Sequence, residues 1–321
     1  MLLMCKNTVV LNMNTMEVHN HNLLPGMLQK HLNKDRLLDW FHKRYSERSN
    51  TASRQIRAKL FGQGNRQLIN QTTYALSLSD CYWVKGLDKK VTFEQVSPYF
   101  NDFWKGEGVY DNEAIPTLYV NGFLTKYWHD SKTLIKHVDE RETICSAVGK
   151  AIGINTVEVK HFGIDKVAVT NFTNADVMFE SAETSGLLDA EDFTADDILT
   201  IYNAAGFDML FLDALVGNGD RHAGNFGSLR DANTGEYLGK SPIFDFDHAY
   251  DSNDANDFLI KEVAEYGAKQ YGHRLQILIT AAQSARLNSY MNVRLDSIMK
   301  HFALHKERAT TGTNNRPFEM G

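Results

Sequence analysis

The alternation of apolar and polar residues predicts β-strands in two parts of the chain. In residues 1–20, apolar side chains recur at every second position on both sides of Asn14 and Thr15, which is typical of a short β-hairpin. Five further runs of strand character lie between residues 115 and 172, with the sequences TLYVNGF, LTKYWH, KTLIKHV, TVEVKHFGI and KVAVTNF. Turn-forming residues separate the first three runs, so we expect antiparallel neighbours and a sheet of five strands.

Helical spacing of the apolar residues predicts helices elsewhere. Residues 23–49 have an apolar face and a basic face, and residues 139–152 carry apolar side chains four positions apart. Thr194, with an acidic residue three positions later, predicts the capped start of a long helix. Residues 257–305 are expected to be helical as well. The polar tail, residues 309–321, is expected to have no regular structure.

The stretch GNGDRHAGNFGSLRDANTGEYLGKSPIFDFD, residues 217–247, carries the candidate chemistry. It places Asp220 five residues before Asn225, and Asp245 at the end of a predicted β-hairpin. Five residues carry the chain around a loop and into a strand. The hairpin then returns the chain beside its start, so all three side chains can face one pocket. Protein kinases hold the Mg²⁺ ions of bound ATP with such a set of oxygen ligands, so the stretch predicts ATP-dependent phosphoryl transfer.

This stretch resembles one group of kinases more than others. Its DRHxxN order, from Asp220 to Asn225, is similar to that of phosphatidylinositol 3-kinase-like enzymes and, more closely, of bacterial HipA-like and CtkA-like serine/threonine kinases. Three more segments resemble that bacterial family in the same order: SLSDCYWV, TLIKHVDERETICSAVGKAIGI and PIFDFD. The chain departs from ordinary eukaryotic protein kinases, because their order is His-Arg-Asp and Asp247 stands where their DFG motif has glycine.

The resemblance implies an α+β fold of the two-lobed protein kinase type, with an antiparallel β N-lobe and a mainly helical C-lobe. The expected domains are an N-terminal accessory region packing on the kinase core (1–112), the N-lobe (113–175), the C-lobe (176–308) and a flexible tail (309–321).

The same resemblance assigns roles around the phosphates. Asp220 is the expected catalytic carboxylate, and Asn225 and Asp245 are the expected Mg²⁺ ligands. His222 is a second catalytic candidate that either hydrogen-bonds the loop or touches the γ-phosphate. Asp247, which follows Phe246, is expected to be a bystander that points away from Asp245.

Nucleotide binding is expected to involve the predicted sheet and the helix after it. Lys136 lies in an apolar strand, where an ammonium group is costly unless it is paired. We expect it to hold the α- and β-phosphates and to pair with Glu142, with Lys126 as the competing candidate. The remaining expected contacts are a phosphate-covering turn at Gly122 and an adenine site at Thr170, Asn171 and Phe172.

Composition narrows the class of protein. The chain has 321 residues, 43% of them apolar, which is enough for a full core and two lobes. The net charge is −6, and no basic block is present, which argues against nucleic-acid binding and against an anionic membrane surface. The three cysteines are widely spaced without a CxxC pair, as expected for reduced thiols in the cytoplasm. The polar N-terminal segment is unlike a signal peptide, and secretion by a signal-independent route stays open.

The sequence therefore predicts a serine/threonine protein kinase that depends on ATP and Mg²⁺. The resemblance implies autophosphorylation, a protein substrate with a Ser or Thr acceptor, and an antitoxin-like or regulatory protein partner. Two alternatives remain open at this stage. One is a kinase of a lipid or small-molecule substrate on the same fold, and the other is a non-catalytic toxin or interaction module.

Overall fold

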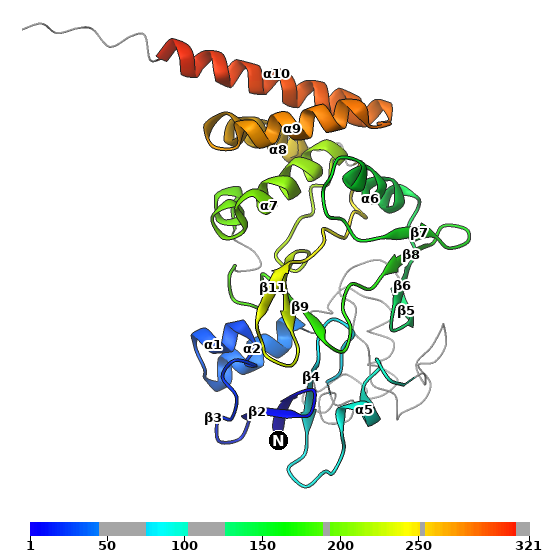
Figure 1. Ribbon diagram of the computed structural model, residues 1–321, viewed down its shortest axis with the longest axis vertical. Helices are drawn as coiled ribbons and strands as arrows, with labels where there is room; N and C mark the ends of the chain where they lie inside the picture. The colour runs from blue at the N-terminus through cyan, green and yellow to red at the C-terminus, as the bar shows by residue number, and fades with distance from the viewer. Residues whose placement is uncertain (45–74, 102–125, 189–192, 251–253, 313–321) are drawn as a thin grey trace, which may run out of the picture. The chain divides into compact units, whose positions relative to one another are not determined.

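The computed structural model describes residues 1–44, 75–101, 126–188, 193–250 and 254–312 (Figure 1). The chain divides into two compact units that interleave along the sequence. Unit 1 comprises Met1–Glu140, Val157–Asp192 and His222–Pro242, and unit 2 comprises Arg141–Thr156, Phe193–Arg221 and Ile243–Gly321. The described strands all belong to unit 1, whereas unit 2 is built from helices α6 to α10.

Unit 1 contains three antiparallel sheets, with strand orders β3-β2-β1-β4, β5-β6-β8-β7 and β11-β10-β9. The strands are β1 (Leu2–Cys5), β2 (Thr8–Asn12), β3 (Glu17–Val18), β4 (Tyr82–Lys85), β5 (Lys126–Asp130), β6 (Thr133–Lys136), β7 (Val159–His161), β8 (Val167–Thr170), β9 (Val177–Ser181), β10 (Gly227–Asp231) and β11 (Tyr237–Lys240). The fold is thus a mixture of antiparallel sheets and helices, as the sequence predicts.

The helices are shared between the units. Unit 1 has α1 (Gly26–Lys30), α2 (Lys34–Arg44) and α5 (Phe93–Val96), and unit 2 has α6 (Arg141–Ala151), α7 (Ala195–Val216), α8 (Asp254–Lys269), α9 (Gly272–Ser284) and α10 (Ser289–Gly312). Within unit 2, α8 packs against α7, α9 and α10 (Figure 1). Helix α10 continues to Gly312, four residues past the end of the predicted C-lobe.

Most predicted elements near the N-terminus are confirmed, with one correction. The hairpin forms between β2 and β3, and β1 pairs with β2 on its other side. The helix predicted over residues 23–49 is wrong in one respect, because it is divided into α1 and α2. The break has a local cause. The side chain of Asn33 accepts a hydrogen bond from the backbone N–H of Arg36 at 2.8 Å, which caps the start of a new helix.

The sheet predicted between residues 115 and 172 is also present. Four of its five expected strands form the sheet β5-β6-β8-β7, and the run TLYVNGF lies outside the described residues. The predicted hairpin before Asp245 is confirmed as β10 and β11, and β9 adds a third strand to it.

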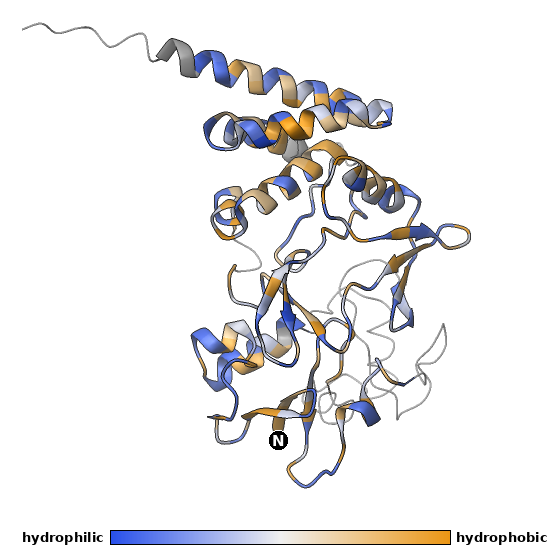
Figure 2. Ribbon diagram, in the orientation of Figure 1, coloured by the Kyte–Doolittle hydropathy of each residue, from blue (hydrophilic) through white to orange (hydrophobic). Residues whose placement is uncertain are grey.

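Helix α7 forms the core of unit 2 and leads to the candidate site. Its start at Thr194 is the predicted capping box, in which Asp197 N–H donates to Thr194 Oγ1 at 3.3 Å and Thr194 N–H donates to Asp197 Oδ2 at 2.8 Å. Apolar residues prevail along its later turns (Figure 2). Among the described helices it alone is long and apolar enough to cross a membrane. However, 67% of its most apolar stretch is buried, which is typical of a core helix.

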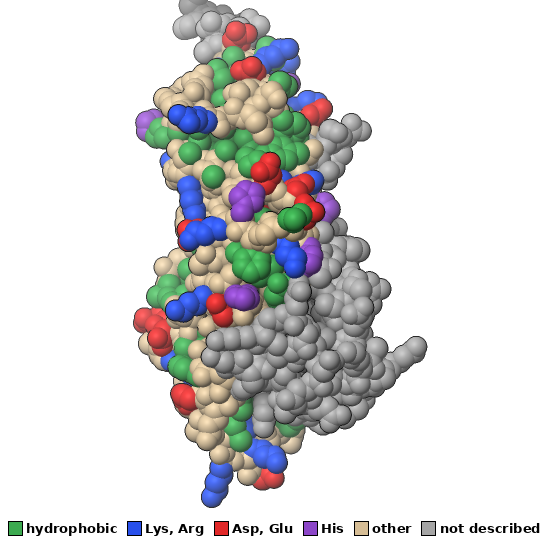
Figure 3. Space-filling view, turned by 90° about the vertical axis from the view of Figure 1, so that its right-hand side faces the viewer, with side chains coloured by type: hydrophobic (Ala, Val, Ile, Leu, Met, Phe, Trp, Pro, Cys, Tyr) green, Lys and Arg blue, Asp and Glu red, His purple; other side chains and the backbone are tan. Residues whose placement is uncertain are grey.

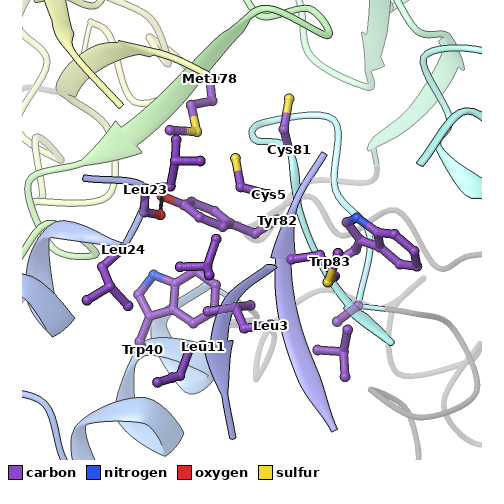
Figure 4. Packing of buried hydrophobic residues seen from close by; sticks show 14 of the residues in the cluster. Leu3, Cys5, Leu11, Leu23, Leu24, Trp40, Cys81, Tyr82, Trp83 and Met178 are labelled. Atoms are coloured by element: carbon purple, nitrogen blue, oxygen red, sulfur yellow. Dashed lines mark hydrogen bonds between the residues drawn. The ribbon is translucent and has the colours of Figure 1, made fainter. Parts of the chain in front are cut away.

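The described parts of the first hundred residues, 1–44 and 75–100, share one hydrophobic core with β9 and the end of β10. Leu3, Leu11 and Trp40 are buried together with Tyr82, whose hydroxyl donates to the carbonyl oxygen of Leu23 at 2.9 Å (Figure 4). Met178 of β9 and Ala232, directly after β10, belong to the same cluster. The N-terminal region is therefore packed on the hairpin that precedes the Asp245 segment.

A buried ion pair strengthens this connection. Arg230 Nη1 lies 3.1 Å from Glu180 Oε2, and both side chains are nearly inaccessible. The same guanidinium donates to the carbonyl oxygens of Asn22 at 2.6 Å and Leu24 at 3.0 Å, while Glu180 accepts the N–H of Gly26 at 2.6 Å. Both charged groups are satisfied by the chain segment that leads into α1.

Replacing Arg230 by Met is expected to destabilise the protein by about 3–5 kcal/mol, because Glu180 would remain buried without its partner. Chemical denaturation measures the free energy of unfolding. The matched control is Lys6→Met, which removes the exposed Lys6–Asp176 pair and should cost less than about 1 kcal/mol. Equal losses in the two variants would contradict the importance of the buried pair.

Candidate functional site

The loop after α7 presents Asp220 to solvent within unit 2. Helix α7 ends at Gly217, which has left-handed backbone geometry (φ 68°, ψ 45°). Asn218 then turns the chain back on the helix, because its backbone N–H donates to Asp213 O at 3.0 Å and its side chain donates to Asp213 Oδ1 at 2.9 Å. The side chain of Asp220 is 53% exposed. Its carboxylate can therefore meet a substrate hydroxyl.

The segment that carries Asp245 has unusual backbone geometry. Ile243 forms a parallel bridge with Thr156, and its N–H donates to Asn155 O at 2.9 Å. Asp245 has φ of 67°, which a residue other than glycine rarely adopts. The sequence-based expectation that Asp247 points away from Asp245 is wrong, because carboxylate oxygens of the two residues lie within 4.8 Å of each other. Even in a regular strand, residues two positions apart share a face.

Three carboxylates of unit 2 come together at this segment. Oxygen atoms of Glu142, Asp245 and Asp247 lie within 4.8 Å of one another. Glu142, in the first turn of α6, is only 1% exposed, and the two aspartates are partly buried. Arg141 fixes the same segment, since its Nη1 donates to the carbonyl oxygens of Asp247 and Ala249, each at 3.3 Å.

This donor set suits a hard divalent cation. Carboxylate oxygens are the preferred ligands of Mg²⁺, and ligands that share one ion at about 2.1 Å lie roughly 3–4 Å apart. The ligand oxygens of the cluster lie within 4.8 Å of one another, and side-chain rotation would be needed for all three to share one ion. Gathering three negative charges in a partly buried place is costly unless a cation is present or other groups pair with them. The residues therefore fit Mg²⁺.

A second group of ligand atoms lies on the exposed side of the same unit. Asp220, Asp247 and His248 also have potential ligand atoms within 4.8 Å of one another, and His248 Nε2 is 3.8 Å from Asp220 Oδ2. Asp247 therefore belongs to both groups. Asp247 thus lies close to Asp220, the carboxylate proposed for catalysis, and close to Asp245, the proposed metal ligand.

The remaining part of the loop belongs to unit 1, where the end of β9 holds it. Ala182 N–H donates to Phe226 O at 2.9 Å, and Glu183 N–H donates to Ala223 O at 3.1 Å. His222 has a local structural contact, because its Nδ1 accepts the N–H of Gly224 at 3.1 Å. The N–H of Asn225, which is buried, donates to the carbonyl oxygen of His222 at 2.8 Å.

Lys136 and its competitor Lys126 lie directly opposite each other in the sheet. They are register partners in the antiparallel pair of β5 and β6, so their side chains are on the same face. Both are buried, with exposures of 3% for Lys136 and 6% for Lys126. A buried ammonium group is costly unless another group pairs with it, so the same argument applies to both lysines. Lys126 therefore stays a candidate beside Lys136 for the predicted contact with the phosphates.

The proposed adenine positions already take part in internal hydrogen bonds. Thr170 N–H donates to Glu158 O at 2.8 Å, and Asn171 N–H donates to Lys132 O at 2.7 Å. The ring of Phe172 packs edge-on against Phe179, with centroids 5.5 Å apart. An adenine ring bound at this place would therefore have to form its hydrogen bonds with groups other than the N–H of Thr170 and of Asn171. Gly122, the proposed phosphate-covering turn, lies outside the described residues.

Gly217 controls the geometry of the loop start. A Cβ atom at this position would overlap the hydroxyl of Tyr290 from α10. Gly217→Ala is expected to destabilise the protein by roughly 2–4 kcal/mol, of which the positive φ contributes about 1–2. Thermal and chemical denaturation test this. In a Tyr290→Phe background the contact with the hydroxyl is removed and only the closest ring atoms, at 3.0 and 3.1 Å, remain. The same substitution should therefore cost less, and an unchanged cost would contradict the steric explanation.

Two residues near this chemistry were not assigned roles from the sequence: Asp213 and His248. One of them carried a usable signal. Asp213 is a lone carboxylate in the apolar run MLFLDALV, where an unpaired charge would be expensive. The spacing of Asp247 carried a signal as well, because residues two positions apart in a strand share a face.

Charge is mixed on the surface drawn in Figure 3. Acidic and basic side chains of the described residues are interspersed there with apolar ones, and no extended area of one sign is visible on that face. The candidate chemistry is therefore local, and depends on the residue groups given above.

Comparisons with known proteins extend the sequence resemblance to the fold. No protein-family model matches the chain, and no curated protein matches it. Among solved structures, the Helicobacter pylori proinflammatory kinase CtkA matches with 16% identity and a TM-score of 0.39, over 59% of this chain and 94% of CtkA.

A second solved structure covers nearly the whole chain. It is the Shewanella oneidensis MR-1 toxin–antitoxin complex of HipA, HipB and operator DNA, matched with 13% identity and a TM-score of 0.53 over 96% of each chain. At this identity the likeness concerns the fold alone. The resemblance that the motifs indicated is thus confirmed at that level: this chain has a HipA-like fold of mixed α/β type.

Proposed function

We propose that this protein is an ATP- and Mg²⁺-dependent serine/threonine protein kinase that phosphorylates itself. The observation that carries the proposal is the arrangement within unit 2, where Asp247 lies both beside Asp245 and Glu142 and beside Asp220. A carboxylate for the acceptor hydroxyl and a carboxylate set for a metal thus occur together. The HipA-like fold supports the same reading, because the site residues occupy motifs that resemble those of this kinase family.

The proposed mechanism is in-line transfer of the γ-phosphoryl group to a Ser or Thr hydroxyl. Mg²⁺, held by Asn225 and Asp245, would neutralise the charge of the triphosphate. Asp220 orients the acceptor hydroxyl through a hydrogen bond and takes its proton on a carboxylate oxygen. The new P–O bond forms as the bond between the γ-phosphorus and the β–γ bridging oxygen breaks, and ADP leaves with that oxygen. Lys136 positions the α- and β-phosphates, and Glu142 serves as its proposed partner. His222 maintains the loop between Asp220 and Asn225 through its contact with Gly224.

The finer architecture is part of the same proposal. We assign a two-lobed kinase arrangement, with the N-lobe at 113–175, the C-lobe at 176–308 and an accessory region at 1–112. HipA occurs in its structure together with HipB, which supports an antitoxin-like or regulatory protein partner for this chain. The expected cytoplasmic location stays a prediction.

Incubation of the purified protein with Mg²⁺ and γ-labelled ATP tests the proposal. Label on the wild-type chain, absent after Asp220→Asn, is the expected result, and mass spectrometry of the labelled peptide identifies the acceptor. Absence of label on the chain, together with stabilisation by Mg²⁺-ATP in a thermal melt, would favour a lipid or small-molecule acceptor. Absence of both label and stabilisation would overturn the kinase proposal and favour an interaction module.

The paired lysines give a separate prediction. Lys136→Met and Lys126→Met are each expected to raise the ATP concentration for half-maximal labelling by about tenfold, since each removes one positive charge from the same buried face. Titration of ATP at saturating Mg²⁺ measures this. Lys160→Met, at an exposed lysine of β7, is the matched control and should leave the value unchanged. If Lys136→Met alone raises this ATP concentration, Lys126 does not contribute to binding the phosphates.

A further inference from the structure

A buried ion pair in unit 2 joins the end of α7 to the loop that carries Asp220. Arg221 Nε lies 2.9 Å from Asp213 Oδ2, and Arg221 Nη2 lies 2.7 Å from Asp213 Oδ1, so the two groups meet in a bidentate arrangement. The side chain of Asp213 is fully buried, and that of Arg221 is 6% exposed. Asn218 adds a third hydrogen bond, from its side-chain amide to Asp213 Oδ1.

The same guanidinium also reaches the segment that carries Asp245. Arg221 Nη1 donates to the carbonyl oxygen of Phe244 at 2.6 Å, and the guanidinium lies over the ring of Phe246, 5.6 Å from its centroid. These two contacts are on either side of Asp245. Arg221 itself directly follows Asp220. One planar group therefore ties both functional aspartates to the rigid end of α7.

The electrostatic surroundings keep Arg221 charged. Burial alone would lower the pKa of its guanidinium, but Asp213 and, more weakly, Asp245 and Asp220 hold the pKa above its ordinary value. A permanently charged, planar donor with several N–H groups can serve three acceptors at fixed angles, which lysine cannot do.

Stability alone is a weak explanation for this pair. Buried ion pairs are costly to desolvate, and well-packed hydrophobic residues of similar volume are often at least as stable in their place. A second Arg–Asp pair of the same unit provides a comparison. Arg274 and Asp208 form an equally close bidentate pair between α9 and α7, but their side chains are partly exposed and neither is adjacent to a candidate functional residue.

We propose that Asp213 and Arg221 are positioning residues, which hold Asp220 and Asp245 at the separation that phosphoryl transfer requires. This inference rests on the proposed function. Its physical basis is that the reacting groups must be aligned to well within an ångström, so that a displacement of about 1 Å reduces a rate by roughly 100-fold. Release of Phe244 would displace Asp245, and release of the loop would displace Asp220.

The test replaces the ion pair by a neutral one. In the double variant Asp213→Asn with Arg221→Gln, residue 213 still offers an oxygen to Asn218, while residue 221 is too short to reach both Asp213 and Phe244. The expected result is a melting temperature close to that of wild type. The labelling rate at saturating ATP should fall about 100-fold, and the half-saturating Mg²⁺ concentration should rise about tenfold. The matched control, Asp208→Asn with Arg274→Gln, should change neither quantity.

Several outcomes decide the matter. A folded double variant that labels within about threefold of the wild-type rate overturns the inference, as does an equal loss in the control pair. If the double variant does not fold, Arg221→Lys takes its place, because it keeps the charge but loses the bidentate contact. A wild-type rate in that folded variant overturns the inference.

Hydrogen exchange separates this inference from the proposed function. If wild type shows no labelling, the kinase proposal fails. The positioning role can still be measured, because the double variant should exchange amide protons faster in both segments, residues 217–221 and residues 244–250. Unchanged exchange in either segment overturns the inference.

Discussion

Asp220→Asn is expected to abolish phosphoryl transfer while leaving the protein folded. General-base catalysis by a positioned carboxylate contributes about 10²–10⁴-fold, and asparagine cannot take up the proton of the acceptor hydroxyl. The side chain of Asp220 is 53% exposed, so its replacement should change the free energy of unfolding by less than about 0.5 kcal/mol. Labelling with γ-labelled ATP measures the rate, and a thermal melt in parallel measures the fold.

The matched control for this prediction is Asp296→Asn, which makes the same chemical change at an exposed position of α10. It should retain the full labelling rate. If Asp220→Asn keeps more than about a tenth of the wild-type rate, Asp220 is not the general base. His248, 3.8 Å from Asp220, would then be the first candidate for that role.

The sequence predicted correctly those elements whose formation depends on residues close together in the chain. The capping box at Thr194, helix α6 and the hairpin β10–β11 depend on spacing within a few residues, and all three occur where the pattern places them. The division of the helix over residues 23–49 was missed, because it depends on a single side-chain hydrogen bond from Asn33.

The arrangement of the carboxylates could not be predicted in full. Asp245 has a positive φ, and such a conformation is imposed by the surrounding structure rather than by residue type. The ion pair between Asp213 and Arg221 likewise joins the end of α7 to the following loop through a change of chain direction at Gly217. Such contacts arise from packing, so spacing alone does not specify them.

Asp245→Asn is expected to remove the response of the protein to Mg²⁺-ATP. Asparagine adopts positive φ almost as readily as aspartate, so the substitution tests the charge and not the backbone. A ligand at 100 times its dissociation constant stabilises a protein by about 2.7 kcal/mol. Loss of a metal ligand should raise the required Mg²⁺ concentration at least tenfold and remove most of that stabilisation. Thermal melts with and without Mg²⁺-ATP, and with a chelator, measure both quantities.

The control for this last prediction is Asp165→Asn. Asp165 also has positive φ (52°), but it lies on an exposed turn of unit 1 and belongs to neither carboxylate group. The control variant should keep the full Mg²⁺-dependent shift and the full labelling rate. If both variants lose the Mg²⁺-dependent shift, the effect of Asp245→Asn is not specific to the carboxylate cluster. If Asp245→Asn retains the wild-type Mg²⁺ requirement, Glu142 and Asp247 are sufficient as metal ligands, because they complete the same cluster.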